Sequence, residues 1–89
     1  MRAIVTVVGK DQVGIIGAVC TRLASYNINI LDISQTVIDG YFNMIMITDV
    51  SGATLPLAEI ASCMDQEGKE HGMSVRVQRE DIFDAMHKI

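Results

Sequence analysis

The residues of this chain best placed to do chemistry are 9–16, which read Gly-Lys-Asp-Gln-Val-Gly-Ile-Ile. A run of β-branched apolar residues precedes this segment and a helical apolar pattern follows it, so the segment connects a strand to the start of a helix. The backbone N–H groups and the positive dipole end of a helix start favour a small anionic or zwitterionic ligand. The same segment also fits an ordinary strand–helix connection that binds nothing, and the rest of the chain must decide between the two.

The residue types that support catalysis are not grouped in this sequence. His71 and His87, the two histidines, are expected at a helix end and on an exposed helix face, away from any nucleophile or acidic cluster. Asp11, Asp32 and Asp39 fall in a loop, a strand and a turn, without the spacing of a metal site or of a glycosidase acid pair. We therefore predict no enzymatic activity, no catalytic residues, no metal and no cofactor.

Three further classes of site fail at specific positions. A phosphate loop needs Lys-Ser or Lys-Thr where Ile15 and Ile16 stand. A copper- or zinc-carrying domain of this kind needs a Cys-x-x-Cys pair in the first loop, and the loop has none. RNA recognition needs exposed aromatic residues on the first strand, which also has none. The net charge of −4 and the pI near 4.8 further disfavour nucleic acid as a partner.

Length, hydropathy and cysteine use favour a small cytoplasmic domain that associates with itself. The 89 residues suit a single domain, and 49% apolar residues is a high share for so small a chain, which favours a homodimer. No apolar run approaches about 18 residues, so no membrane span is expected. Cys20 and Cys63 fall in helical patterns without a close Cys or His partner, and we expect both to be reduced core residues.

Apolar periodicity predicts six elements in the order β-α-β-β-α-β. Strand patterns alternate with a period of two, whereas helix patterns recur at i, i+3, i+4 and i+7. The expected strands cover residues 2–8, 28–38, 41–50 and 73–78, and the expected helices cover residues 14–26 and 55–71. Right-handed crossovers then give an α+β, ferredoxin-like βαββαβ fold: a four-stranded antiparallel sheet of order 4-1-3-2, with both helices on one face.

Local signals add detail to these elements. Asp39-Gly40 predicts a hairpin turn, and the broken alternation near Asp32 predicts a bulge. Gly68 is expected to let the second helix approach the sheet closely, and Thr54 is expected to cap that helix. The expected buried stripes are Ile16, Val19, Cys20 and Leu23 on the first helix, and Leu57, Ile60, Ala61 and Met64 on the second.

The sheet face away from the two helices is expected to be apolar as well. The residues expected on it are Ile4, Val8 and one of two pairs, Met44 with Met46 or Ile45 with Ile47. Residues 81–89 predict a short amphipathic helix, with Ile82, Phe83, Met86 and Ile89 on one side. We expect residues 1–80 to form the domain and residues 81–89 to pack on it, in cis or on a dimer partner; an amphipathic tail at an edge is the alternative.

Two segments of the chain carry a family resemblance. Residues 6–19, Thr-Val-Val-Gly-Lys-Asp-Gln-Val-Gly-Ile-Ile-Gly-Ala-Val, and the later run Asn27-Ile28-Asn29-Ile30 resemble the ACT domain in its Asp-x-x-Gly turn, its apolar pair opening the helix and its Asn-Ile before the second strand. The resemblance covers the whole chain and is closest to short stand-alone ACT proteins. Residues 32–36 and 78–83 look like the subgroup that includes the regulatory domains of the glycine-cleavage repressor and of formyltetrahydrofolate deformylase.

The resemblance implies a regulatory module that binds an amino acid or a similar small ligand at a dimer interface. By position, it carries ligand-binding roles to Asp11, Gln12, Val13, Gly14, Ile15 and Asn29. Amides at the helix start suit a carboxylate, and the oxygens of Asp11 and Asn29 suit an ammonium group. Asp11 also fits a plain helix cap. The family often has Pro before the glycine, and Val13 in its place leaves the loop less restricted.

Two functions remain open from the sequence. The first is a small-molecule sensor, a homodimer that binds an amino acid or related metabolite and signals to a separate partner protein, which the sequence does not name. The second is a ligand-free dimerisation or protein-interaction module that uses the open sheet face and residues 82–89.

Overall fold

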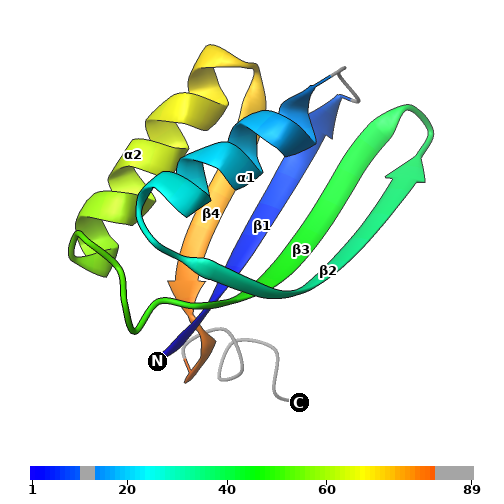
Figure 1. Ribbon diagram of the computed structural model, residues 1–89. Helices are drawn as coiled ribbons and strands as arrows, with labels where there is room; N and C mark the ends of the chain where they lie inside the picture. Colours follow the sequence, from blue (N-terminus) through cyan, green and yellow to red (C-terminus); the bar gives the residue numbers. More distant parts are fainter. Residues whose placement is uncertain (11–13, 82–89) are drawn as a thin grey trace.

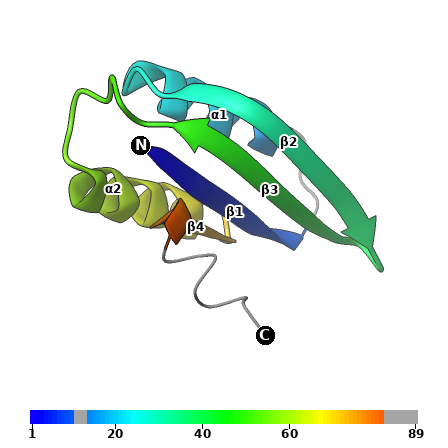
Figure 2. The same ribbon diagram turned by 90° about the horizontal axis from the view of Figure 1, so that it is seen from below.

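Four strands and two helices follow one another in the predicted order. They are β1 (Arg2–Lys10), α1 (Ile15–Ser25), β2 (Asn29–Ile38), β3 (Tyr41–Asp49), α2 (Leu57–Glu70) and β4 (Met73–Arg79). The computed structural model describes residues 1–10 and 14–81. The strands form one antiparallel sheet of order β2-β3-β1-β4, and both helices lie on the same side of it (Figures 1 and 2). The predicted fold and strand order are confirmed. The predicted C-terminal helix, residues 81–89, lies outside the described residues except for Asp81.

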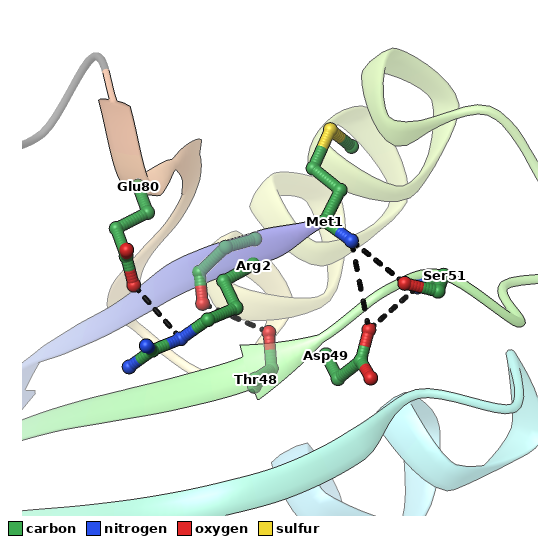
Figure 3. Close-up of polar contacts among 7 residues, drawn as sticks. Met1, Arg2, Thr48, Asp49, Ser51 and Glu80 are labelled. Carbon is green, nitrogen blue, oxygen red and sulfur yellow. Dashed lines mark hydrogen bonds and ion pairs between the residues drawn. The ribbon is translucent and has the colours of Figure 1, made fainter.

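The hydrophobic core lies between the helices and the sheet. Alternate residues of β1 and β3 point into it, and each helix adds one apolar stripe. Its fully buried side chains include Val5, Val7, Val19, Leu23, Met44, Met46, Ile60, Met64 and Val75. Thr48 is the buried polar residue of the described chain, and its hydroxyl donates a hydrogen bond to the carbonyl oxygen of Ala3 at 2.9 Å (Figure 3). Because this hydroxyl has a partner, it can be buried without an unpaired donor.

The predicted hairpin turn and the predicted bulge are both confirmed. Asp39 and Gly40 both have positive φ angles, 51° and 79°, as a two-residue type I′ hairpin turn requires. Asn27 follows α1 in the left-handed conformation, with φ 60°. The register of β2 against β3 shifts between Ile30 and Asp32, where the bulge was expected.

The close approach of α2 to the sheet is also confirmed. A Cβ atom added to Gly68 would lie 2.8 Å from the carbonyl oxygen of Met73 and 2.8 Å from a methyl carbon of Val75. Both contacts are shorter than van der Waals separation, so only glycine fits between this helix and β4.

The prediction of the α1 stripe is wrong by one residue at its start. Ile15 is 5% exposed and packs in the core together with Val19 and Leu23, whereas Ile16 is 37% exposed. Both residues are branched and apolar, so the sequence pattern does not distinguish them. The start of α1 decides which of the two is buried: Gly14 has φ 84°, the helix begins at Ile15, and this first helical residue faces the sheet.

The predicted cap of the second helix is wrong. The helix begins at Leu57, Pro56 occupies the capping position, and no side chain caps it, so Thr54 lies outside the helix. The physical reason is the proline, which disfavours helical backbone in the residue before it and so keeps Leu55 out of the helix.

The sheet face away from the helices carries Ile45 and Ile47 rather than Met44 and Met46. Strand register places Ile4 opposite Ile47, and it places Val8 opposite Asn43 on the same face. We call the apolar residues Ile4, Val8, Ile45 and Ile47 the open face. Ile45 is 43% exposed and Val8 38%, while Ile4 is buried and Ile47 half-buried.

Candidate functional site

The predicted ligand loop joins β1 to α1. Asp11, Gln12 and Val13 lie outside the described residues. Gly14 forms the N-cap of α1 with φ 84°, and it has no side chain with which to cap the helix. A Cβ atom there would contact nothing within 4 Å, so the backbone conformation, not crowding, requires a glycine. Its carbonyl accepts the first helical hydrogen bond, from the amide of Ala18 at 3.0 Å.

The helix start therefore presents backbone rather than side chains to any ligand. Ile15 was predicted to bind ligand, but its side chain points into the core and is 5% exposed. Ile15 can contribute only its amide. The exposed side chain beside it is that of Ile16, which the sequence reasoning assigned to the core.

Asn29, the remaining predicted ligand residue, begins β2 at the other end of the domain. It is exposed and pairs with Asp49 of β3. Gly14 precedes α1 and Asn29 follows it, and the 11 residues of this helix span about 16 Å. Figure 1 shows the β1–α1 connection at one end of the sheet and the start of β2 at the opposite end. A single chain therefore does not bring Gly14 and Asn29 together.

The outer edge of β2 is the largest feature that the sequence reasoning did not identify. Within the described residues, β2 pairs with β3 alone, and Asp32 is the one charged residue among its ten. Four of its apolar side chains are 43–62% exposed: Leu31, Ile33, Val37 and Ile38. Edge strands that stay single are usually short or charged, whereas β2 has ten residues and a single charge. The sequence signal was present in the predicted strand order, which already placed this strand at an edge.

A shallow groove of about 330 Å³ separates the outer sides of α1 and α2. Arg22 of α1 donates to Glu67 of α2 at 3.1 Å, and His71 Nε2 lies 3.6 Å from the same carboxylate. None of the sequence-predicted ligand residues that the structure describes lines this groove. We interpret the ion pair as a surface link between the helices, where such pairs contribute about 0–1 kcal/mol.

Cys63 lies beside this groove, and its expected burial is wrong. Ile60, Met64 and Gly68 take the sheet side of α2 at a four-residue spacing, which turns Cys63 toward solvent. Burial raises the pKa of the Tyr26 hydroxyl above its ordinary value, and a hydrogen bond with Cys63 raises it further. Both cysteines of the described chain are free thiols.

Residues 1–10 and 14–81 contain neither a metal-binding cluster nor a membrane-spanning helix. No three of their His, Cys, Asp or Glu side chains come together as a metal site would require. None of the helices in these residues is long and apolar enough to cross a membrane.

Comparison with known proteins assigns the chain to a family. The family model of the ACT domain matches residues 2–78, which run from the start of β1 to the penultimate residue of β4. The chain belongs to the ACT domain family. ACT domains are generally regulatory, ligand-binding domains.

Relatives and solved structures agree with this assignment. A UPF0237 protein of Bifidobacterium longum is 51% identical over 88 residues, which cover 99% of this ACT domain protein and 98% of the relative. An ACT domain protein from Streptococcus pneumoniae has a similar structure, with a TM-score of 0.82, 36% identity and 94% of each chain covered.

Larger proteins contain the same fold as one part. A formyltetrahydrofolate deformylase from Pseudomonas syringae matches with a TM-score of 0.79 and 25% identity, over 88% of this chain and 27% of the deformylase. A glycine cleavage system transcriptional repressor shares the fold at 20% identity, with a TM-score of 0.74, over 88% of this chain and 44% of the repressor. The resemblance to this subgroup of ACT domains, noted from the sequence, is confirmed at the level of the fold.

Proposed function

We propose that this ACT domain protein is a small-molecule sensor. In this proposal a homodimer binds an amino acid or related metabolite between the β1–α1 loop of one protomer and β2 of the other, and it signals to a separate partner protein in the cytoplasm. One observation carries the proposal: Gly14 and Asn29 lie at opposite ends of α1, and Asn29 begins the strand whose apolar outer edge a second copy can cover.

Strand directions support completion of the site in trans. Lys10 and Ile38 both pair with Tyr41, so the β1–α1 loop and the end of β2 lie at the same end of the sheet. If two copies pair their β2 edges antiparallel, the start of one β2 lies beside the end of the other. Asn29 of the partner subunit then lies at the same end as Gly14. Pairing along β2 also covers the exposed Val37 and Ile38.

The chemistry of the two halves fits a zwitterion. The amides at the start of α1 and the helix dipole favour a carboxylate beside Gly14. The carboxylate of Asp11 and the amide oxygen of Asn29 are acceptors for an ammonium group. Gln12 and Val13 complete the loop, and the exposed Ile16 offers an apolar contact for a side chain of the ligand.

Thermal-shift measurements with each of the twenty amino acids test this proposal. At 100 times the Kd, a ligand stabilises the folded state by about 2.7 kcal/mol, which corresponds to a rise of roughly 10–20 °C for a domain of this size. Asp11→Ala and Asn29→Ala should remove the rise while light scattering still reports a dimer. If no amino acid shifts the melting temperature, the sensor proposal fails.

The second candidate function is a dimerisation module without ligand. The exposed apolar residues of β2 favour this function, because a second copy that covers them removes apolar surface from water whether or not a ligand is present. These residues are Leu31, Ile33, Val37 and Ile38. A stable dimer with no response to any amino acid would support this function instead.

A further inference from the structure

The open face is an apolar surface on the side of the sheet that α1 and α2 do not cover (Figure 2). Ile4 pairs directly with Ile47, and Ile45 is the next residue of β3 on this face. Thr6 and Arg76 continue the same row onto β4. A contiguous apolar surface with a polar surround is typical of a docking site.

The chain leaves β4 toward this face. Along β1, Arg2 alternates with the core residue Ala3 and lies on the same side as Ile4. Arg2 Nε contacts Glu80 Oε2 at 2.9 Å (Figure 3). Glu80 and Asp81 have helical backbone directly after β4, and Arg79 Nε donates to Asp81 Oδ1 at 3.0 Å. These contacts place Glu80 and Asp81, the last two described residues, at the Arg2 end of the open face.

The sequence that follows matches the face in chemistry and length. Four apolar residues recur at helical spacing: Ile82, Phe83, Met86 and Ile89. On the other side of such a helix, Asp84 and Lys88 form an i,i+4 pair, with the acidic residue nearer the positive end of the helix. A helix from residue 80 to residue 89 would measure about 15 Å, which spans roughly three strand spacings of 4.8 Å.

We propose that residues 82–89 continue the helix begun at Glu80 and pack in cis across the open face, with their apolar side on Ile45 and Ile47. The ion pair between Arg2 and Glu80 directs the helix to this face. This arrangement closes the open face to other proteins and leaves the β2 edge as the surface for a second copy. The inference does not depend on ligand binding.

Disulfide trapping tests where residues 82–89 pack and whether they belong to the same chain as the face they cover. Ile45→Cys and Met86→Cys are introduced together in a Cys20→Ser, Cys63→Ser background, and the protein is mildly oxidised. We expect a cross-link within one chain, seen as a faster-migrating monomer on a non-reducing gel. A covalent dimer would show packing from a partner chain, and absence of any cross-link would show that the helix does not cover Ile45; either result overturns the proposal. Met86→Cys with the native Cys63, on the helix side of the sheet, is the control that should not link.

A double-mutant cycle tests the contact without oxidation. Ile45→Glu should lower the melting temperature of the full chain by roughly 5 °C or more, and this loss should largely disappear in a chain ending at Asp81. Ile16→Glu, at a residue of similar exposure on the helix side, should have the same effect in both lengths. Equal losses for Ile45→Glu in both lengths would refute the contact, whatever the outcome of the ligand experiments.

Discussion

Gly68→Ala tests the close packing between α2 and β4, because two effects of opposite sign compete at this residue. Gly68 lies inside α2, where alanine is favoured over glycine by about 0.8–1.0 kcal/mol in helix propensity. The added methyl group, however, would lie 2.8 Å from the backbone oxygen of Met73. That oxygen belongs to β4, which is paired with β1, so it cannot move aside without disturbing the sheet.

We expect the steric cost of the added methyl group to exceed the gain in helix propensity. Overpacking of a buried site costs typically 1–3 kcal/mol, and here the obstacle is backbone rather than a flexible side chain. Because backbone cannot move aside, we take the upper half of this range, about 2–3 kcal/mol. Subtracting the propensity gain of about 0.8–1.0 kcal/mol leaves a net loss of stability of about 1–2 kcal/mol. The melting temperature should fall by about 4–8 °C for each kcal/mol. Urea denaturation and differential scanning calorimetry of the variant measure both quantities.

Gly17→Ala is the matched control for this prediction. Gly17 lies in α1, and a Cβ atom added there would contact nothing within 4 Å. The same substitution should therefore stabilise the protein by about 0.5–1 kcal/mol. The reasoning is refuted if Gly68→Ala is as stable as the parent protein, or if both substitutions change stability in the same direction.

Three further predictions concern the edge strand, the ligand loop and pH. Val37→Lys places a charge on the exposed β2 edge and should shift light-scattering mass from dimer toward monomer with the circular dichroism spectrum unchanged; an unchanged dimer would exclude this edge as the interface. Gly14 has a left-handed backbone with φ 84°, so Gly14→Ala should lower the free energy of unfolding by about 1 kcal/mol in a urea titration, and Gly14→Asn should lower it by less. Equal stability of the parent protein and both variants would contradict the argument that this backbone is strained for other residues. Hydrogen bonds from the Ser51 hydroxyl and amide hold the pKa of Asp49 below its ordinary value. Because the folded-state pKa is the lower one, this stabilisation is present above the unfolded pKa of about 3.9 and is lost as pH falls through the folded value. The denaturation midpoint of Asp49→Asn should accordingly depend less on pH in the acid range than the midpoint of the parent protein. If the two proteins gave parallel plots of midpoint against pH, ionised Asp49 would not contribute this stabilisation.

Much of the fold was predictable because it rests on local signals. Asp39-Gly40 specifies a type I′ turn, because both positions of that turn need a positive φ. Apolar residues recur every two positions in the strands and at i, i+3, i+4 and i+7 in the helices, which distinguishes the two kinds of element. The errors arise where neighbouring residues are chemically equivalent. Ile15 and Ile16 are both branched apolar residues, so their types do not say which one faces the sheet.

The candidate site was predictable only in part. The glycine at position 14 and the motif around it identified the loop, and the glycine is explained by its left-handed backbone. The separation of Gly14 from Asn29 follows from the helix predicted between them, whose 11 residues span about 16 Å. The exposure of Ile33 and Val37 was not predictable, because it depends on how far the helices extend over the sheet.

The sequence by itself determined the order of elements, the turns and the family, because these depend on backbone preferences and side-chain periods that each segment carries alone. Only the tertiary structure decided which face of β3 is buried. Both faces of β3 are apolar at its centre, with Met44 and Met46 on one face and Ile45 and Ile47 on the other. Which face is buried therefore follows from the side on which the two helices pack. The same packing leaves Ile45 on the open face and β2 exposed at the edge. These are the two surfaces that we propose for the C-terminal residues of the same chain and for a second copy.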